Sequence, residues 1–126
     1  MGNGELSKRA HERLDVWQEA MRLVEMIYTL TAGFPADERF GLTTQIRRAA
    51  VSVPSNIAEG AARRSTAEYQ RFLSIARGSL SEMSTQLQIA TRLGYMQSDP
   101  DTDASVDRVF AKLTALMNAL TTRGDS

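Results

Sequence analysis

Residues 65–94 read STAEYQRFLSIARGSLSEMSTQLQIATRLG, and this stretch decides the fold class. Its apolar residues recur at alternating spacings of four and three, which is typical of one face of an amphipathic helix. That seam consists of Tyr69, Leu73, Ala76, Leu80, Met83, Leu87 and Ala90. Ser65 and Glu68 fit a capping box at its start, and Gly94 is a stop signal at its end. We therefore expect one long helix here.

Three more amphipathic segments surround this helix. They are expected over residues 15–31, from about 37 or 40 to 64, and over 103–120. Pro54 lies inside the second, where it removes a backbone donor and clashes with the carbonyl four residues back, so we expect a kink rather than two helices. Short connections favour antiparallel neighbours. The sequence thus predicts an all-α, antiparallel up-down-up-down four-helix bundle whose second helix is kinked at Pro54.

The length of 126 residues suits one domain with one core. We expect a flexible N-terminal arm over residues 1–13, the bundle over 14–122, and a frayed C-terminus over 123–126. The arm lacks the apolar core of a signal peptide, and no apolar run approaches the roughly 20 residues of a membrane span. These features predict a soluble, cytoplasmic protein with no membrane partner.

The residue types that carry most catalysis and metal binding are scarce. Cysteine is absent, and His11 is the only histidine. A Ser-His hydrolase is therefore not expected, and His11 reads as an ordinary surface residue, since known zinc motifs cluster several ligands. Carboxylates of a bundle can hold a di-metal site, but such sites use Glu-x-x-His pairs that this sequence lacks. Solvated or interfacial carboxylates are the preferred interpretation for Glu19, Glu25, Glu59 and Glu82. We expect no enzyme, metal or cofactor.

Charge is distributed unevenly although the net charge is zero. Residues 39–92 hold eight arginines against three glutamates, a balance of +5, and the flanking segments carry −3 and −2. Arginine is the side chain best suited to forked phosphate contacts. The candidate nucleic-acid-binding residues are Arg47, Arg48, Arg63, Arg64, Arg71 and Arg77. A solvated or ion-paired surface, in which the basic middle attracts the acidic ends, is the equally weighted alternative.

Residues 53–60, VPSNIAEG, form the most unusual block. Small residues would let another helix approach closely, and Asn56 and Glu59 are polar in a region otherwise suited to burial. We prefer a structural role, in which they satisfy polar groups freed near the kink, because buried polar groups need partners. A ligand-facing polar pair is the alternative. The structural motif comprises Pro54, Ser55, Asn56, Glu59 and Gly60.

Several blocks of the sequence together resemble a known family. The blocks are LDVW (14–17), ERFGL (38–42), QIRRAA (45–50), VPSNIAEG (53–60), YQRFL (69–73) and IARGSL (75–80). The chain resembles the four-helix bundle proteins called 23S rRNA intervening-sequence proteins, over about residues 14–95. It is also similar to the accessory proteins of diversity-generating retroelements, which share this architecture.

The resemblance implies an assembly and a partner. It implies a homo-oligomer, a pentameric ring or barrel, and the relatives of the second group bind nucleic acid through a basic surface. A ring would account for apolar residues beyond those that a bundle core needs, and these are the expected oligomer interface: Trp17, Met21, Tyr28, Phe72 and Ile75. Our leading hypothesis is a non-enzymatic homo-oligomer that binds structured RNA or DNA through arginines. The alternative is a protein-protein interaction scaffold without nucleic acid binding.

Overall fold

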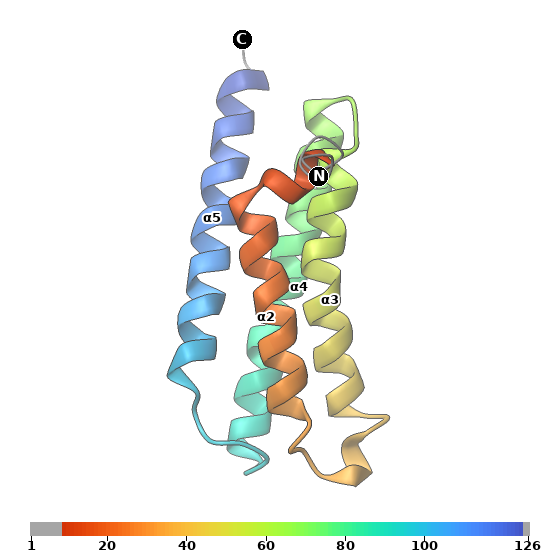
Figure 1. The fold of residues 1–126 in the computed structure, drawn as a ribbon, viewed down its shortest axis with the longest axis vertical. Helices are drawn as coiled ribbons and strands as arrows, with labels where there is room; N and C mark the ends of the chain where they lie inside the picture. The colour runs from red at the N-terminus through yellow and green to blue at the C-terminus, as the bar shows by residue number, and fades with distance from the viewer. Residues whose placement is uncertain (1–8, 125–126) are drawn as a thin grey trace, which may run out of the picture.

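Four long helices make up most of the computed structural model, which describes residues 9–124. The elements, in chain order, are η1 (Ala10–Arg13), α2 (Asp15–Thr31), η2 (Ala36–Glu38), α3 (Leu42–Ala61), α4 (Thr66–Arg92) and α5 (Pro100–Gly124) (Figure 1). No strand occurs within this described range. The prediction of an all-α four-helix fold is therefore confirmed.

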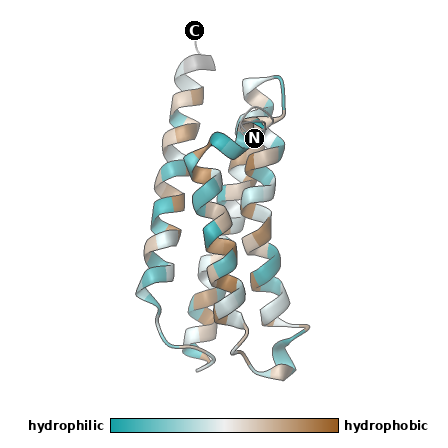
Figure 2. Cartoon of the chain, viewed as in Figure 1, coloured by the Kyte–Doolittle hydropathy of each residue, from teal (hydrophilic) through white to brown (hydrophobic). Residues whose placement is uncertain are grey.

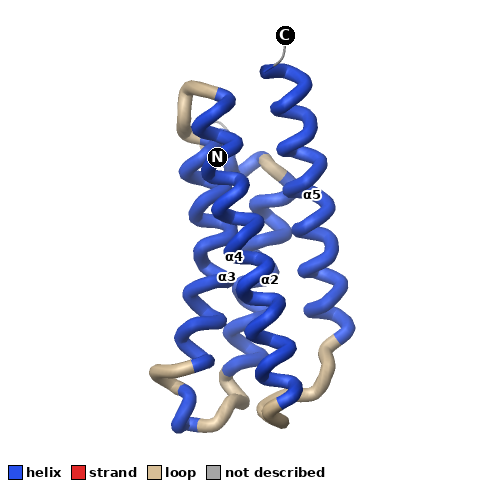
Figure 3. The backbone as a smooth tube through the Cα atoms, turned by 180° about the vertical axis from the view of Figure 1, so that it is seen from behind, coloured by secondary structure: helices blue, strands red, loops and turns tan. Residues whose placement is uncertain are grey.

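The helices pack as a ring of four neighbours. α3 packs on α2 and α4, and α5 packs on α4 and α2, whereas the backbones of the two diagonal pairs lie farther apart. The start of α4 meets the second half of α5, where Gln70 Nε2 donates to Met117 O at 2.6 Å. The start of α2 meets the middle of α5, where Asp15 pairs with Lys112. The loops gather at the two ends of the bundle (Figure 3). This arrangement is compatible with the up-down-up-down order.

The core is built from the seams that the sequence pattern identified. Six of the seven seam residues of α4 are buried, and Tyr69 at its end is half-buried. They meet Leu23 and Ile27 of α2 and Ile46 and Ile57 of α3 in one contiguous cluster. Hydrophobic and hydrophilic residues alternate along each helix accordingly (Figure 2). Burial of this shared apolar stripe holds the four helices together.

At the junction between α4 and α5, Gly94 ends the first helix and Pro100 begins the second. Gly94 has φ +81°. Its N–H donates to Thr91 O at 3.1 Å, and the Tyr95 N–H donates to Ala90 O at 2.9 Å, which together make a Schellman motif. α5 then begins at Pro100, one turn before the predicted start at 103. Proline suits the first position of a helix because it needs no donor there.

The turn before α3 is held by one carboxylate. Glu38 Oε1 accepts a hydrogen bond from Leu42 N at 2.9 Å, and Glu38 Oε2 accepts one from the Tyr95 hydroxyl at 2.7 Å. These bonds, that of Leu42 first, hold the pKa of Glu38 below its usual range. Glu38 therefore bonds to the first residue of α3 and ties it to the α4–α5 loop. α3 begins at Leu42, later than the predicted start at 37 or 40, because residues Ala36–Glu38 form a separate 3-10 turn. It ends at Ala61, before the predicted end at 64.

The expected arm and frayed end overlap the limits of the described residues. Residues 1–8 of the arm and residues 125–126 lie outside the described range. Within it, η1 packs against α2 and α3, and the half-buried His11 ring lies edge-on to Trp17 at 5.0 Å between centroids. α5 continues to Gly124, four residues beyond the predicted helix end.

Pro54 lies inside a helix that does not break. α3 runs continuously from Leu42 to Ala61, as expected, and the Pro54 side chain is buried. The kink itself stays a prediction. Nearby, Ser55 Oγ donates to Val51 O at 2.8 Å, and Asn56 Nδ2 donates to Ser52 O at 2.8 Å. Asn56 is thus half-buried and bonded to its own helix, in keeping with the structural interpretation.

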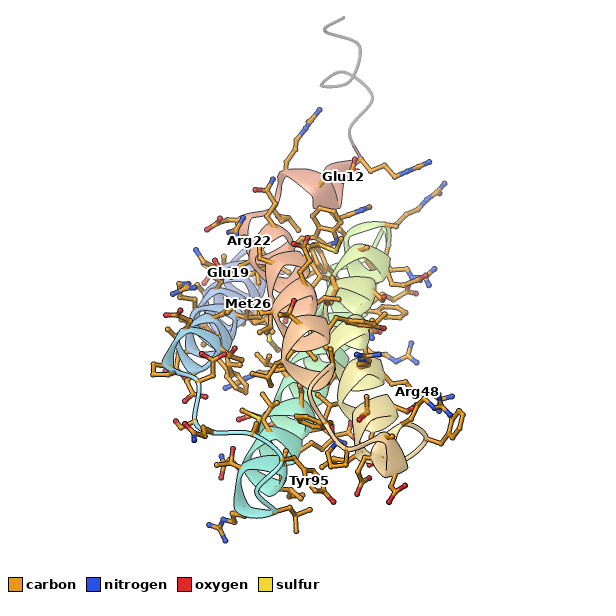
Figure 4. The ribbon with its side chains drawn as sticks, turned by 60° about the horizontal axis from the view of Figure 1, so that its bottom comes forward. Glu12, Glu19, Arg22, Met26, Arg48 and Tyr95 are labelled. Carbon is orange, nitrogen blue, oxygen red and sulfur yellow. The ribbon has the colours of Figure 1, made fainter. Side chains whose placement is uncertain are left out.

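A buried carboxylate joins α2 to α5. Among the four glutamates considered above, Glu19 is buried and the other three are exposed. Its Oε2 accepts from Ser105 Oγ at 3.0 Å and Arg108 Nη2 at 3.2 Å, and its Oε1 accepts from Arg22 at 3.1 Å. Glu19 and Arg22 lie together along α2 in Figure 4. Burial raises the pKa of Glu19, but hydrogen bonds from Arg108, Arg22 and Ser105 outweigh it, so the pKa is lowered.

Two glycines on neighbouring helices predict opposite effects of one substitution. A Cβ at Gly60 would lie 2.9 Å from Tyr69 Cδ1 and 3.2 Å from Tyr69 O, whereas a Cβ at Gly78 meets nothing within 4 Å. Gly60→Ala should destabilise the protein by about 1–3 kcal/mol through overpacking. Gly78→Ala, the matched control, should stabilise it by up to about 1 kcal/mol through helix propensity. Urea unfolding at one protein concentration measures both, and a stabilising Gly60→Ala would contradict the packing described.

The Glu19 network predicts a pH-dependent loss. Because the pKa of Glu19 in the folded state lies below its ordinary value of 4.5, its ionised form stabilises the fold above that pH, and the contribution disappears as pH falls through the folded pKa. Glu19→Gln should cost about 1–3 kcal/mol at pH 7, and the gap from the parent protein should shrink below pH 4.5. Glu25→Gln, at an exposed site of α2, controls for charge. A gap that stays constant down to pH 3 would exclude this role.

Candidate nucleic-acid interface

Arg47 is held in place by α2. Its Nε donates to Thr31 Oγ1 at 2.8 Å, and its Nη2 donates to Tyr28 O at 3.3 Å. The guanidinium carbon also lies 4.4 Å from the centroid of the Tyr28 ring, a cation–π contact. Two of its five N–H donors are thus used within the bundle. Arg47 fastens the C-terminal end of α2 to α3.

Arg48 differs from its neighbour in sequence. Its side chain is exposed, and in Figure 4 it projects on the opposite side of the bundle from Glu19 and Arg22. Within the described part of the chain, no ion pair or hydrogen bond involves its guanidinium. Its charge is therefore available to an external anion.

A second basic cluster lies where α3 meets α4. The Arg63 and Arg71 guanidinium carbons lie 4.8 and 5.3 Å from the centroid of the same ring, that of Phe72. Arg63 Nη2 also pairs with Glu59 Oε2 at 2.7 Å, a bond between exposed groups. Arg64 follows in the connecting turn and is exposed. Phe72 thus brings two positive charges within about 10 Å of each other. We call Arg63, Arg64, Arg71 and Phe72 the Phe72 cluster.

The predicted arginines do not all share one face. Arg48 lies in the first half of α3, and about 20 Å of helix separates it from the end of α3 at Ala61. Arg63 lies beyond that end, in the turn before α4. Arg77 lies two turns after Gln70, whose side chain bonds to α5. Arg77 is accordingly on the α5 side of α4, away from the Phe72 cluster.

The VPSNIAEG block (53–60) packs α3 against α4 next to the Phe72 cluster. Ser52 Oγ, hydrogen-bonded to Asn56 Nδ2 at 2.9 Å, lies 2.8 Å from Ser79 Oγ of α4. Gly60 is buried against Tyr69 and Phe72. Glu59 points outward to Arg63 and takes no part in bonding near Pro54. Of the polar residues of the block, Asn56 thus bonds within the packed helix, whereas Glu59 forms an ion pair with Arg63 at the surface.

The residues predicted for subunit contacts lie on two surfaces. Met21, Tyr28 and Ile75 expose 39%, 42% and 41% of their surface. A groove of about 340 Å³ between α2 and α3 is lined mainly by apolar residues, namely His11, Trp17, Met21, Val24, Val51, Pro54, Ser55 and Ala58. Ile75 lies instead on α4 near Phe72, which the two arginines cover. The α2–α3 groove is therefore the more continuous apolar surface.

Two other kinds of site are not found in the described range. No group of three or more His, Cys, Asp or Glu side chains is arranged there to hold a metal ion. None of the helices between residues 9 and 124 is both long and apolar enough to cross a bilayer.

The contrast between Arg47 and Arg48 yields a stability prediction. Arg47→Ala removes two hydrogen bonds and a ring contact, so it should destabilise the protein by about 1–3 kcal/mol. Arg48→Ala removes the same side chain from the next position and should change stability by less than about 0.5 kcal/mol. Thermal and urea unfolding followed by circular dichroism measure the difference. Equal losses in both variants would contradict the assignment of Arg47 to the helix junction.

Comparison with known proteins places the chain in a family. No curated protein matches it significantly. The family model described as "23S rRNA-intervening sequence protein" matches residues 12–119, from η1 into the last turns of α5. Since the match covers most of the chain, the chain belongs to the 23S rRNA-intervening sequence protein family.

Proposed function

We propose that the protein is a non-enzymatic homo-oligomer that binds structured RNA or DNA through phosphate contacts made by arginines of α3, of α4 and of the turn between them. The observation that carries the proposal is the Phe72 cluster, where two guanidinium groups share one ring. Stacking restricts these long side chains before a ligand arrives, so less entropy is lost when they bind a phosphate. Arg48 adds an exposed cation on α3. Its neighbour Arg47 is held against α2 by its bonds to Thr31 and Tyr28.

The distribution of ion pairs favours an external partner for the arginines. Four salt bridges join described residues, and three of them lie on α2 or between α2 and α5. The remaining one, Glu59–Arg63, pairs two residues of the basic segment with each other. Among residues 9–122, none connects this segment to the acidic ends of the chain. Attraction between the basic middle and the acidic ends is therefore a weaker explanation for the excess of arginine.

Self-association would place several copies of the Phe72 cluster in one assembly. The apolar α2–α3 groove, with Trp17 and Met21 on its wall, offers a surface that a second copy can cover. We propose a pentamer on the basis of the family resemblance, acting in the cytoplasm. Repetition of the Phe72 cluster around a ring would add avidity. Phosphate contacts carry no direct sequence information, so we expect weak sequence specificity.

Anisotropy titrations test the proposal. A labelled RNA hairpin and a labelled DNA duplex are titrated with the protein at several salt concentrations. We expect affinity to fall steeply with salt, and Arg63→Ala/Arg64→Ala should weaken binding and flatten the salt dependence by about two phosphate contacts per protomer engaged. Arg77→Ala/Arg92→Ala removes the same total charge at two positions of α4 outside the Phe72 cluster, and this variant should weaken binding less. Glu59→Gln should strengthen binding, because Glu59 competes for Arg63.

Two results of these titrations would contradict the proposal. No binding of either nucleic acid at low salt would refute the proposal. Equal losses from both double variants would refute the assignment to the Phe72 cluster.

The α2–α3 groove also favours the second candidate, a protein-interaction scaffold without nucleic acid binding. In that case the arginines serve subunit contacts, and Arg63→Ala/Arg64→Ala should dissociate the oligomer. Analytical ultracentrifugation of this variant beside Met21→Glu distinguishes the two functions. On the proposed function, only Met21→Glu lowers the mass.

A further inference from the structure

A second groove between α2 and α3 has a different chemical character from the apolar one. Its volume is about 470 Å³, within the usual range of small-molecule sites. It is lined by Tyr28, Thr44, Arg47, Arg48, Val51 and Ser52. This lining joins one aromatic ring and two cations with no carboxylate. Such a combination suits an anion that carries a flat apolar group.

The aromatic part of the groove is organised in advance. Arg47 stacks on Tyr28 at 4.4 Å and is fixed there by its bonds to Thr31 Oγ1 and Tyr28 O. The Tyr28 side chain still exposes 42% of its surface. Bases that are not stacked in a helix bind proteins by stacking on aromatic rings or on arginine guanidinium planes. Both surfaces are present here in one rigid pair.

The anionic part of a ligand would meet Arg48. Its exposed guanidinium lines the same groove and has no ion-pair partner within the described residues. Two of the three hydroxyls of the lining already donate or share hydrogen bonds, Thr44 with Arg39 O and Ser52 with Ser79 Oγ. The third belongs to Tyr28 itself.

We propose that this groove binds a nucleotide, with the base stacked on the Tyr28–Arg47 pair and the phosphate on Arg48. The nucleotide is either free or an unstacked unit of a single strand, and in the second case the inference rests on the proposed function. Tyr28 then stays accessible in the assembly and does not serve as a subunit contact, the role that the sequence pattern suggested for it.

Nuclear magnetic resonance with defined probes tests the groove. AMP, adenosine and inorganic phosphate are titrated separately into the intact protein. We expect AMP to shift the ring signals of Tyr28 and the amide signals of Arg47, Arg48 and Val51, with at least tenfold weaker binding of adenosine and of phosphate alone. Equal shifts with inorganic phosphate, or shifts confined to other parts of the bundle, would overturn the proposal.

Three variants separate stacking from charge. Tyr28→Leu should weaken AMP binding about tenfold, since stacking of one base is worth that order of magnitude, and Tyr28→Phe should restore it. Arg48→Ala should weaken AMP binding but leave adenosine unchanged. Arg92→Ala, at an exposed position near the end of α4, is the control and should leave AMP binding unaltered. Loss of AMP binding in Tyr28→Leu together with a fall in oligomer mass would assign Tyr28 to the subunit interface and refute the site.

Strand length and secondary structure distinguish the two sources of the nucleotide. A five-residue oligoadenylate that binds at least tenfold tighter than AMP, with the same dependence on Tyr28, identifies a single strand as the ligand. Binding no tighter than that of AMP identifies a free nucleotide. If a duplex binds through the Phe72 cluster while AMP and the oligoadenylate leave Tyr28 unshifted, this inference fails and the proposed function stands. If AMP binds at Tyr28 and no strand binds at all, the proposed function fails and the nucleotide site stands.

Discussion

The close approach of α3 to α4 is the constraint on which the rest of the structure depends. Gly60 leaves no room for a Cβ beside Tyr69 and Phe72. Two turns earlier, Ser52 Oγ accepts a hydrogen bond from Asn56 and shares one with Ser79 Oγ of α4. Because the two helices are this close, the Phe72 ring of α4 lies beneath the Arg63 guanidinium of the turn that follows α3, as well as the Arg71 guanidinium of its own helix. The packing of small residues and the gathering of positive charge thus have one cause.

Charged side chains are arranged differently on the α2–α5 side and on the α3–α4 side of the bundle. On the α2–α5 side, Glu19 accepts bonds from Arg22, Ser105 and Arg108, so opposite charges balance within the fold. On the α3–α4 side, the charges lie on rings and at the surface, and among the acids of residues 9–122 Glu59 alone pairs with an arginine there. A buried or paired charge contributes to the fold, whereas an exposed, preoriented guanidinium retains its capacity to bind phosphate.

The α2–α3 side of the molecule offers two surfaces of unlike chemistry in a row. The groove around Trp17 and Met21 is apolar and suits another protein surface, and the groove around Tyr28 and Arg48 pairs an aromatic ring with cations. A ring-shaped assembly that covers the first and leaves the second open would present its nucleotide grooves and its Phe72 clusters on one repeated surface. Contacts of that kind would be individually weak and collectively strong.

The sequence by itself determined the fold class, the positions of the four helices and most of the core. Spacings of three and four, together with the signals at Ser65 and Gly94, depend only on local helix geometry, and such signals can be read without knowing the neighbours. The start of α5 at Pro100 was missed by one turn, although proline at a first helical position is also a local signal. Tertiary structure alone decided which arginines lie close together and which are fixed within the bundle. Arg47 and Arg48 look equivalent in sequence, but only Arg47 reaches Thr31 and Tyr28. Likewise, the burial of Glu19 depends on Ser105 and Arg108, which are more than eighty residues away in the chain and come close only when α5 packs on α2.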